Sequence, residues 1–353
     1  MNDLYLIGNG FDLAHGLETS YNHFLLWYLN NFLEKYRIKG HPNQFEDDLL
    51  KIIVENGKYC IPEYKTISEL MKGVKENGYR LKGKHDFFQK LIENYRDFKW
   101  VDIEYEYYVA LVEIYKVLEN KNLIRSDYHF NQVASLNNCF DAIRLKLIEY
   151  LQSIEVTHEK HIQIIEDALI GGNGPRNNDK GDKLYVYFNY TNTMSLYSPK
   201  ISPKNQVVYI HGELSDVNNP VIFGYGDEMH PYYEKIENLN SNDFLKNIKS
   251  FNYFKTNNYQ RIIRFIEANF RPYTVKILGH SCGLSDRILL NTIFEHPNCK
   301  AVKIYYHQKS EKENDYFEKT QEISRHFKST SKGKMRNKIV SFERSVPLLP
   351  FTK

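Results

Sequence analysis

The sequence predicts an α/β protein with a Rossmann-like, mostly parallel sheet and a large helical insertion after its first strand. Three observations lead to this prediction. An apolar strand at residues 4–7 runs directly into a glycine turn. Residues 21–170 are then patterned mainly as helices, and beyond a polar loop at 171–183 short strands and helices alternate. We therefore divide the chain into a first strand with its turn (1–20), a helical insertion or cap (21–170) and the remainder of the α/β domain (171–353).

The first strand, at residues 4–7, ends at Gly8, Asn9 and Gly10, with Asp12 close behind. A strand that enters a Gly-x-Gly turn is how nucleotide-binding folds present backbone N–H groups to phosphates. The third glycine of the dinucleotide-binding motif is absent, so a plain tight turn is the alternative. On the first interpretation these four residues bind a nucleotide.

The helical insertion begins at Thr19 and Ser20, which precede apolar residues at helical spacing. Further helical segments are predicted at 45–54, 87–95, 103–118 and 136–151. We expect this region to cover a site at the strand ends. Asp102 lies directly before one of these segments, where it either caps the helix or carries a carboxylate into that site.

The region after residue 183 contains several predicted strands, each followed by polar or glycine residues. These strands are at 184–188, 207–210, 221–223 and 275–278, followed by 302–306 and a further candidate at 338–342. Ligands of open α/β sheets bind outside the carboxyl ends of the strands, so we expect one shared site there. Its candidate residues after these strands are Asn189, Asn192, His211, Gly212, Asp227, Gly279, Ser281 and Asp286.

Three of these residues are candidates for catalysis. His211 has an ordinary pKa near ~6.5 that suits general acid–base chemistry, although a turn hydrogen bond or a metal would also explain it. Asn189 donates and accepts hydrogen bonds at once, which suits holding a ribose hydroxyl or a water, or alternatively forming a turn. Asp227 is one of several carboxylates suited to stabilising an oxocarbenium-like ribose, as in glycoside hydrolysis. Each of these carboxylates has helix capping as its alternative.

The composition excludes several classes of protein. The net charge is +3 with acidic and basic residues interspersed, so charge does not indicate a nucleic-acid binder. Four scattered cysteines form neither a zinc signature nor a disulfide framework, and we predict no metal. There is no signal-peptide pattern and no apolar stretch of about 18 residues, so we expect a cytoplasmic protein with no membrane contact.

The motifs resemble those of the bacteriophage abortive infection AbiH family. Residues 6–17, Leu-Ile-Gly-Asn-Gly-Phe-Asp-Leu-Ala-His-Gly-Leu, look like the opening of that family. The rest of its pattern is matched by Trp-Val-Asp-Ile-Glu at 100–104, Phe-Asn-Tyr-Thr-Asn-Thr at 188–193, Ile-His-Gly at 210–212, Phe-Gly-Tyr-Gly-Asp at 223–227 and Gly-His-Ser-x-Gly-x-x-Asp at 279–286. The resemblance runs from residue 4 to about residue 307, and it implies an antiviral defence protein with a phage component as a possible trigger.

The order of these motifs is also similar to that of sirtuin-like domains, which bind NAD on a Rossmann-type sheet. Their defence-associated members cleave the bond between nicotinamide and ribose and are commonly controlled by homo-oligomer assembly. The resemblance implies a phosphate loop at Gly8 and Gly10, a ribose- and water-orienting role for Asn189, a general base in His211 and a ribose or adenine contact for Ser281. NAD is then the expected substrate.

This chain departs from the sirtuin-like pattern at three places. Asn9 stands where that family has a small residue, and Thr191 stands where an aspartate is expected. The zinc-binding cysteine quartet of the deacylases is absent, which argues against deacylation. A nucleotide-binding or nucleic-acid-acting defence protein without NAD cleavage is therefore the main alternative.

A third interpretation is a serine hydrolase. Residues 279–283, Gly-His-Ser-Cys-Gly, fit the nucleophile-elbow motif and follow a predicted strand. Ser281 would then be the nucleophile, with Asp286 or Asp315 and His307 or His326 available after it in the chain. This interpretation leaves His211 unexplained.

Overall fold

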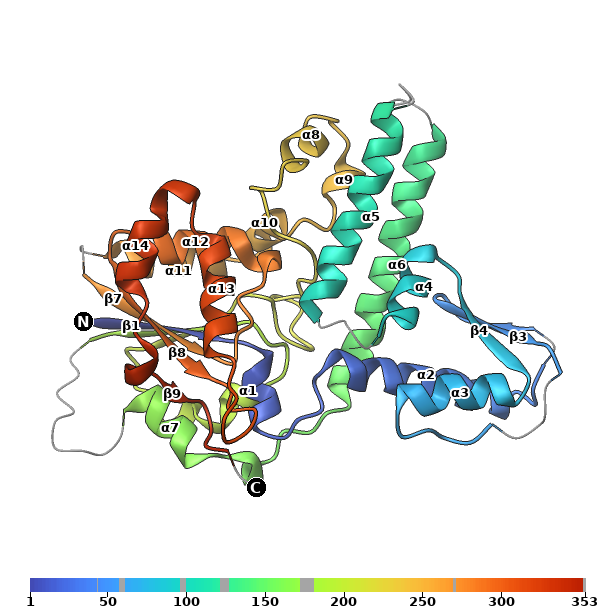
Figure 1. Cartoon of the computed structure of the whole chain (residues 1–353), viewed down its shortest axis with the longest axis horizontal. Coiled ribbons are helices and arrows are strands. Elements are labelled where there is room, and N and C mark those ends of the chain that lie inside the picture. The colour runs from blue at the N-terminus through green and yellow to red at the C-terminus, as the bar shows by residue number, and fades with distance from the viewer. Residues whose placement is uncertain are drawn as a thin grey trace. The chain divides into compact units, whose positions relative to one another are not determined.

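The computed structural model describes residues 1–42, 44–56, 61–95, 100–120, 127–171, 181–268 and 271–351, without the side chains of 100–102 and 127–130. The chain forms two compact units, which we describe separately (Figure 1). Unit 1 comprises Met1–Glu18, Ile154–Met229 and Ile248–Lys353, and unit 2 comprises Thr19–Ser153 and His230–Asn247.

Unit 1 is built on a six-stranded sheet in which every neighbouring pair is parallel. Its strands are β1 (Asn2–Ile7), β5 (Lys183–Tyr187), β6 (Gln206–Tyr209), β7 (Tyr273–Leu278), β8 (Cys299–Tyr306) and β9 (Val346–Pro347). Their spatial order is β6-β5-β1-β7-β8-β9. Numbered one to six along the chain, this is the order 3-2-1-4-5-6 of dinucleotide-binding Rossmann folds, so the predicted fold class is confirmed.

The central strand β1 is buried on both faces because successive side chains of a strand point in opposite directions. Leu4 and Leu6 pack into one hydrophobic core and Tyr5 and Ile7 into another, and all four are fully buried. The first core also takes side chains from α11, α12 and α13, and the second takes side chains from α1 and α7. The sheet is therefore the middle of three layers (Figure 1).

The helices of unit 1 connect these strands. They are α1 (Asn9–Ala14), α7 (Gln163–Ile170), α10 (Lys249–Asn252), α11 (Asn258–Glu267), α12 (Arg287–Glu295), α13 (Tyr316–His326) and α14 (Lys332–Lys338). The most amphipathic of them, α11, buries Ile262 and Ile266 against the sheet, as the spacing of its apolar residues predicts.

Two predicted strands of unit 1 are wrong. Residues 221–223 form no ladder, because this loop folds back and the Ile222 N–H donates to the carbonyl of His211 at 2.8 Å. Residues 338–342 lie between the end of α14 and a 3-10 turn, and only Ile339 bridges to Val302 of β8. The sixth strand of the sheet is instead β9, after that turn.

Unit 2 is mainly helical, with a small antiparallel sheet. Its elements are α2 (Tyr21–Ile38), β2 (Phe45–Glu46), β3 (Leu50–Val54), α3 (Ile67–Glu76), β4 (Tyr79–Gly83), α4 (Asp86–Glu93), α5 (Trp100–Asn120), α6 (Asp127–Gln152), α8 (Tyr233–Glu237) and α9 (Asn242–Leu245). The predicted start of α2 is confirmed, since the Ser20 side chain accepts a hydrogen bond from the His23 N–H. Asp102 falls inside α5 rather than before it, and its side chain lies outside the described residues.

The predicted helix at 45–54 is wrong, because this segment is the hairpin of β2 and β3. Asp47 causes the turn, since its Oδ1 accepts hydrogen bonds from the N–H groups of Leu49 and Leu50 at 2.9 and 2.8 Å. The side chains of Ile52, Ile53 and Val54 are β-branched and favour a strand. The spacing of the apolar residues alone does not distinguish this hairpin from a helix.

Residues 242–247 belong to unit 2 through a buried polar network with α5 and α6. The Tyr107 hydroxyl donates to Asn137 Oδ1 at 2.5 Å, and Asn247 Nδ2 donates to the same oxygen at 3.2 Å. Asn137 Nδ2 in turn donates to the carbonyl of Asp243 at 2.9 Å. Within the described ranges, neither unit contains a helix with the length and apolar character needed to cross a membrane.

Candidate functional site

Two glycine turns meet at the carboxyl ends of the adjacent strands β1 and β7. A Cβ added to Gly279, whose φ is +70°, would lie 2.1 Å from the backbone nitrogen of Phe11. A Cβ added to Gly8 would lie 2.5 Å from the Cα of His280. The two turns therefore approach so closely that only glycine fits. They meet where the strand order reverses, which is the usual ligand position in this fold.

The predicted phosphate loop uses its amides within the fold. The Gly8 N–H donates to the Leu278 carbonyl at 3.2 Å, and the Gly10 N–H donates to the Gly279 carbonyl at 2.8 Å. Asn9, which lies between them, is half-buried at the first position of α1. These glycines are thus explained by the packing of two backbone turns.

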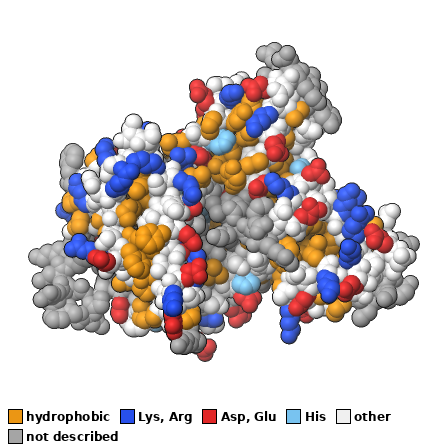
Figure 2. Space-filling view, in the orientation of Figure 1, with side chains coloured by type: hydrophobic (Ala, Val, Ile, Leu, Met, Phe, Trp, Pro, Cys, Tyr) orange, Lys and Arg blue, Asp and Glu red, His pale blue; other side chains and the backbone are white. Residues whose placement is uncertain are grey.

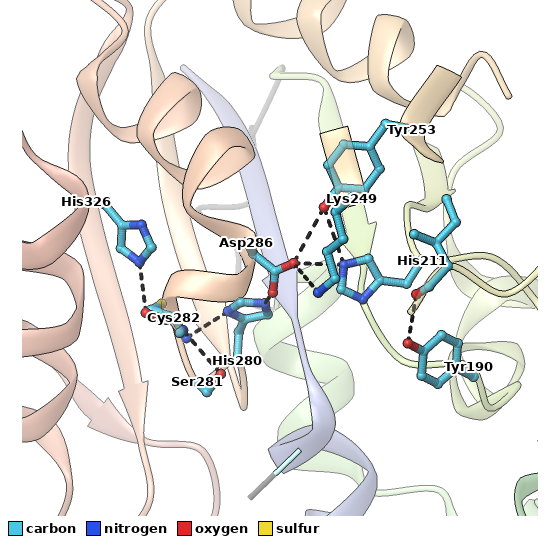
Figure 3. A network of polar contacts seen from close by, with 11 residues as sticks. Tyr190, His211, Lys249, Tyr253, His280, Ser281, Cys282, Asp286 and His326 are labelled. Carbon is cyan, nitrogen blue, oxygen red and sulfur yellow. Dashed lines mark hydrogen bonds and ion pairs between the residues drawn. The ribbon is translucent and has the colours of Figure 1, made fainter. Parts of the chain in front are cut away.

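Five buried residues form a polar centre around the carboxylate of Asp286, which we call the Asp286 cluster: His211, Lys249, Tyr253, His280 and Asp286 (Figure 3). They come from the segments after β6 and β7 and from α10 with its following turn. Oδ1 of Asp286 lies 2.9 Å from both His211 Nε2 and Lys249 Nζ, and 3.5 Å from the Tyr253 hydroxyl. Oδ2 lies 3.6 Å from His280 Nε2.

The charges in the Asp286 cluster determine which ring nitrogen of His211 carries the proton. Burial alone would raise the pKa of Asp286, but the Lys249 ammonium and the His211 imidazole outweigh it and hold the pKa well below its usual value. The ionised carboxylate only accepts hydrogen bonds, so Nε2 of His211 must be the donor. Burial and then Lys249 lower the pKa of His211, and the neutral ring consequently keeps its lone pair on Nδ1.

His280 is fixed in the same manner. Its Nδ1 accepts the Cys282 N–H at 2.9 Å, so its remaining proton is on Nε2 and points toward Asp286. Burial lowers the pKa of His280, which keeps it neutral. The ring of Phe188 contacts both imidazoles, with its centroid 5.1 Å from that of His211 and 4.1 Å from that of His280.

A second buried group lies at the ends of β1 and β5, and we call it the Asp12 cluster: Asp12, Tyr187, Asn189, Thr191 and Thr193. Thr191 Oγ1 donates to Asp12 Oδ2 at 2.5 Å, and the Tyr187 hydroxyl donates to Oδ1 at 3.2 Å. Asn189 Nδ2 donates to the Gly8 carbonyl at 3.0 Å. Burial raises the pKa of Asp12 to about 6, because these neutral partners only partly offset the loss of water.

Asp227 and two other predicted residues lie outside both clusters. The Asp227 carboxylate is buried and paired with Arg287 Nη1 at 3.0 and 3.3 Å, so it anchors its loop to the start of α12. Asn192 is exposed, and its carbonyl accepts from Ser195. Gly212 has φ +88°, where an added Cβ would lie 2.3 Å from the Pro220 carbonyl oxygen.

The nucleophile-elbow geometry is not assembled around Ser281. This residue is exposed, and its Oγ accepts the Gly283 N–H at 3.3 Å. The non-glycine residue with positive φ in this turn is Cys282, at 57°, rather than Ser281, and burial raises the pKa of the Cys282 thiol to about 12. His326 Nε2 donates to the Cys282 carbonyl at 2.8 Å rather than to a serine (Figure 3). Among the described residues, no histidine forms a hydrogen bond with the Ser281 hydroxyl.

The sequence predicted His211 and Asp286 for one site, and the structure places them in contact, but Lys249 and Tyr253 were not predicted. Both lie in a short segment with no motif, and lysine is abundant throughout the chain. Gly226 packs against this segment, because an added Cβ there would lie 2.8 Å from the Ser285 carbonyl oxygen and 3.2 Å from the Cβ of Lys249. The glycine leaves room for the Ser285 backbone and the lysine stem, and only the structure reveals this.

The described residues contain no group of three or more His, Cys, Asp or Glu side chains placed to hold a metal ion. On the face shown in Figure 2, basic and acidic side chains both occur across the described surface, interspersed with apolar ones. Of the four cysteines, Cys139, Cys282 and Cys299 are buried free thiols, and Cys60 lies outside the described residues.

The sheet order and the two clusters define a doubly wound α/β protein with a buried histidine–carboxylate–lysine centre at its strand ends. Residues 4–308 match the family described as Bacteriophage abortive infection AbiH, and the chain belongs to this family. Membership implies a role in phage abortive infection. Neither the curated proteins nor the solved structures gave a match to the chain.

Proposed function

We propose that this protein is an abortive-infection effector that hydrolyses the nicotinamide–ribose bond of NAD. The observation that carries the proposal is the His211–Asp286 pair at the carboxyl ends of a sheet with the 3-2-1-4-5-6 order. A neutral imidazole whose Nε2–H is held by a carboxylate is oriented to accept a proton on Nδ1, as in the serine-protease triad but with the two ring nitrogens exchanged. No described residue donates a hydrogen bond to that Nδ1.

The proposed reaction needs one base and one water. Water attacks C1′ of the ribose, and the bond from C1′ to the nicotinamide nitrogen breaks with its electron pair remaining on nicotinamide. The proton lost by the water passes to His211 Nδ1, and the products are ADP-ribose, nicotinamide and a proton. General-base catalysis of this kind contributes about 10²–10⁴-fold to a rate.

Asn189 and Asp12 support the proposal from the neighbouring strand ends. Asn189 follows Phe188 directly, and the Phe188 ring centroid lies 5.1 Å from that of His211. Its Nδ2 is anchored on Gly8. Asp12 supplies a buried carboxyl beside Thr191, the position where the sirtuin-like pattern has an aspartate. The proposal assigns no phosphate contact to the Gly8 and Gly10 amides, since both already donate within the fold.

The test is nicotinamide release from NAD by the purified protein, followed by chromatography. Reactions run with and without an extract of phage-infected cells, which would supply a missing trigger. We expect release by the wild type and a loss of at least about 100-fold in His211→Ala and Asn189→Ala. His307→Ala is the matched control, because that side chain is exposed and its backbone alone contacts Asp315.

The other outcomes separate the alternatives. A rise in melting temperature with NAD but no nicotinamide release would mean a nucleotide-binding defence protein without cleavage. A ligand at a hundred times its Kd stabilises by about 2.7 kcal/mol, which a melting curve detects. Neither release nor a melting shift, with the extract present, would reject NAD as the substrate.

A further inference from the structure

Lys249 is held inside unit 1 by its own backbone. Its side chain is only 1% exposed. The Lys249 N–H donates to the Tyr225 carbonyl at 2.9 Å, and the preceding Ile248 bridges to Tyr225. Gly226, the next residue of that loop, has no side chain to obstruct the lysine stem. This burial is unusual for a lysine, which is almost never fully buried unless it is paired.

The ammonium of Lys249 shares one oxygen with the candidate base. Lys249 Nζ and His211 Nε2 each lie 2.9 Å from Oδ1 of Asp286. Among the described residues, the other titratable groups facing His211 are Tyr253, whose hydroxyl is 3.5 Å from Nε2, Tyr190, whose ring centroid is 6.2 Å from that of His211, and His280 on the far carboxylate oxygen. All three are neutral, so one positive and one negative charge balance in the cluster.

This charge balance determines how favourable protonation of His211 is. A carboxylate alone stabilises an imidazolium and so favours protonation. Here the lysine already neutralises the carboxylate, and a protonated His211 would be a second cation on the same oxygen. Because the dielectric constant of such a buried site is low, the repulsion between these two positive charges is strong.

We propose that Lys249 is a positioning residue that neutralises Asp286 and thereby keeps His211 an uncharged base with its lone pair on Nδ1. The use of that base in NAD hydrolysis rests on the proposed function. The effect of Lys249 on the charge of His211 is independent of the proposed function.

The experiment is a pH titration of His211 by NMR in protein carrying isotope-labelled histidine, with the signal assigned from its loss in His211→Gln. Lys249→Gln removes the charge but keeps an N–H donor for Asp286. We expect the pKa of His211 to rise by at least about 1 pH unit, since an unneutralised carboxylate within contact distance has effects of about 1–3 units. Lys249→Arg keeps the charge and should leave the pKa at its wild-type value. A pKa in folded Lys249→Gln that is unchanged or lower overturns the proposal.

A second pair of variants provides the test if Lys249→Gln does not fold. Asp286→Asn leaves the ammonium opposite His211, whereas the double variant Lys249→Met, Asp286→Asn removes both charges. The pKa of His211 should be higher in the double variant, and equal values would overturn the proposal. Replacing a buried ion pair by neutral groups of similar size is often tolerated.

The enzymatic readout separates this proposal from the proposed function. If wild type releases nicotinamide, the acid limb of its pH–rate profile should move upward in Lys249→Gln by the same interval as the NMR pKa. If wild type releases none, the NAD proposal fails, while the titration still tests the effect of Lys249 on His211.

Discussion

At the scale of single residues, Asp12 is a buried carboxyl whose hydrogen-bond partners are uncharged. Its carboxyl is 1% exposed, and the partners Thr191 and Tyr187 are neutral hydroxyls. No cation among the described residues compensates for the lost hydration, which is why burial raises the pKa of Asp12 from 3.8 to about 6. The ionised form therefore costs the folded protein stability at neutral pH.

Asp12→Asn should stabilise the protein at pH 7 by up to about 3 kcal/mol, the free energy that corresponds to this pKa difference. The sign follows from proton binding. The folded state binds the proton more tightly, so the stability that Asp12 contributes is fully present below about pH 4 and is lost as the pH rises through about 6. Urea unfolding at several pH values measures this, and the variant should lack that fall.

The control for this change is Asp167→Asn, on the exposed side of α7. It should alter stability by no more than about 0.5 kcal/mol at any of these pH values. Identical pH dependence of wild type and Asp12→Asn between pH 4 and pH 7 would contradict the assignment.

At the scale of elements, the turn after β7 is fixed by backbone contact with the turn after β1. Gly279 has a positive φ, and its Cα faces the Gly10 and Phe11 backbone. Neither neighbour is a flexible side chain that moves aside at low cost. The geometry of the Asp286 cluster depends on this turn, because His280 follows Gly279 directly.

Gly279→Ala should destabilise unit 1 by about 3 kcal/mol, combining left-handed backbone strain with overpacking. Gly333→Ala is the matched glycine control. Gly333 is exposed in α14, and an added Cβ there meets nothing within 4 Å. It should be neutral or stabilising by up to about 1 kcal/mol. Thermal unfolding of both variants checks the prediction, and a Gly279→Ala protein as stable as wild type would refute it.

The sequence predicted those elements whose pattern matches their burial. β1 and β5 are buried at every residue, because both faces of this parallel sheet are covered, and their apolar runs indicate it. β6, β7 and β8 were also predicted, although residues such as Val207, Lys276 and Lys303 are only half-buried in them. The hairpin at 45–54 was missed because the capping hydrogen bonds of Asp47, rather than apolar spacing, decide its structure. The loop at 221–223 was mistaken for a strand because its residues are buried although they form no strand ladder.

The candidate site was predictable where a residue follows a strand. His211 and Asp286 were found on that basis, and the structure places them in contact. Lys249 and Tyr253 come from outside any strand end, and only the folded chain brings them to the carboxylate. The roles of Gly8 and Gly10 could not be predicted from the sequence either, because their hydrogen-bond partners are backbone atoms some 270 residues away in sequence.

At the scale of the whole molecule, several buried histidines make the protein sensitive to acid. Burial lowers the pKa of His211 and His280, and it lowers the pKa of His326 to about 4. In the unfolded chain histidines take up protons near pH ~6.5. The unfolded state therefore binds more protons below that pH, and stability falls as the pH decreases.

His326→Gln should reduce the acid sensitivity. Glutamine keeps an N–H donor for the Cys282 carbonyl but does not titrate. Between pH 7 and pH 5 wild type should lose about 2 kcal/mol more than the variant, from the lowered His326 pKa alone. Denaturant unfolding at both pH values measures the difference. His307→Gln, at an exposed position, should behave as wild type, and equal losses in all three proteins would disprove the role of His326.

The placement of β1 between β5 and β7 has a consequence for how the protein is made. β1 is synthesised first, yet its neighbours are β5 at Lys183–Tyr187 and β7 at Tyr273–Leu278. At about 5–20 residues per second, the ribosome needs roughly 10–40 s after β1 to deliver β5. The proposed base and the carboxylate that holds it arrive later still, at residues 211 and 286. A chain abandoned before that point carries neither a complete sheet nor a complete centre, so interrupted translation releases only inert fragments of the proposed effector.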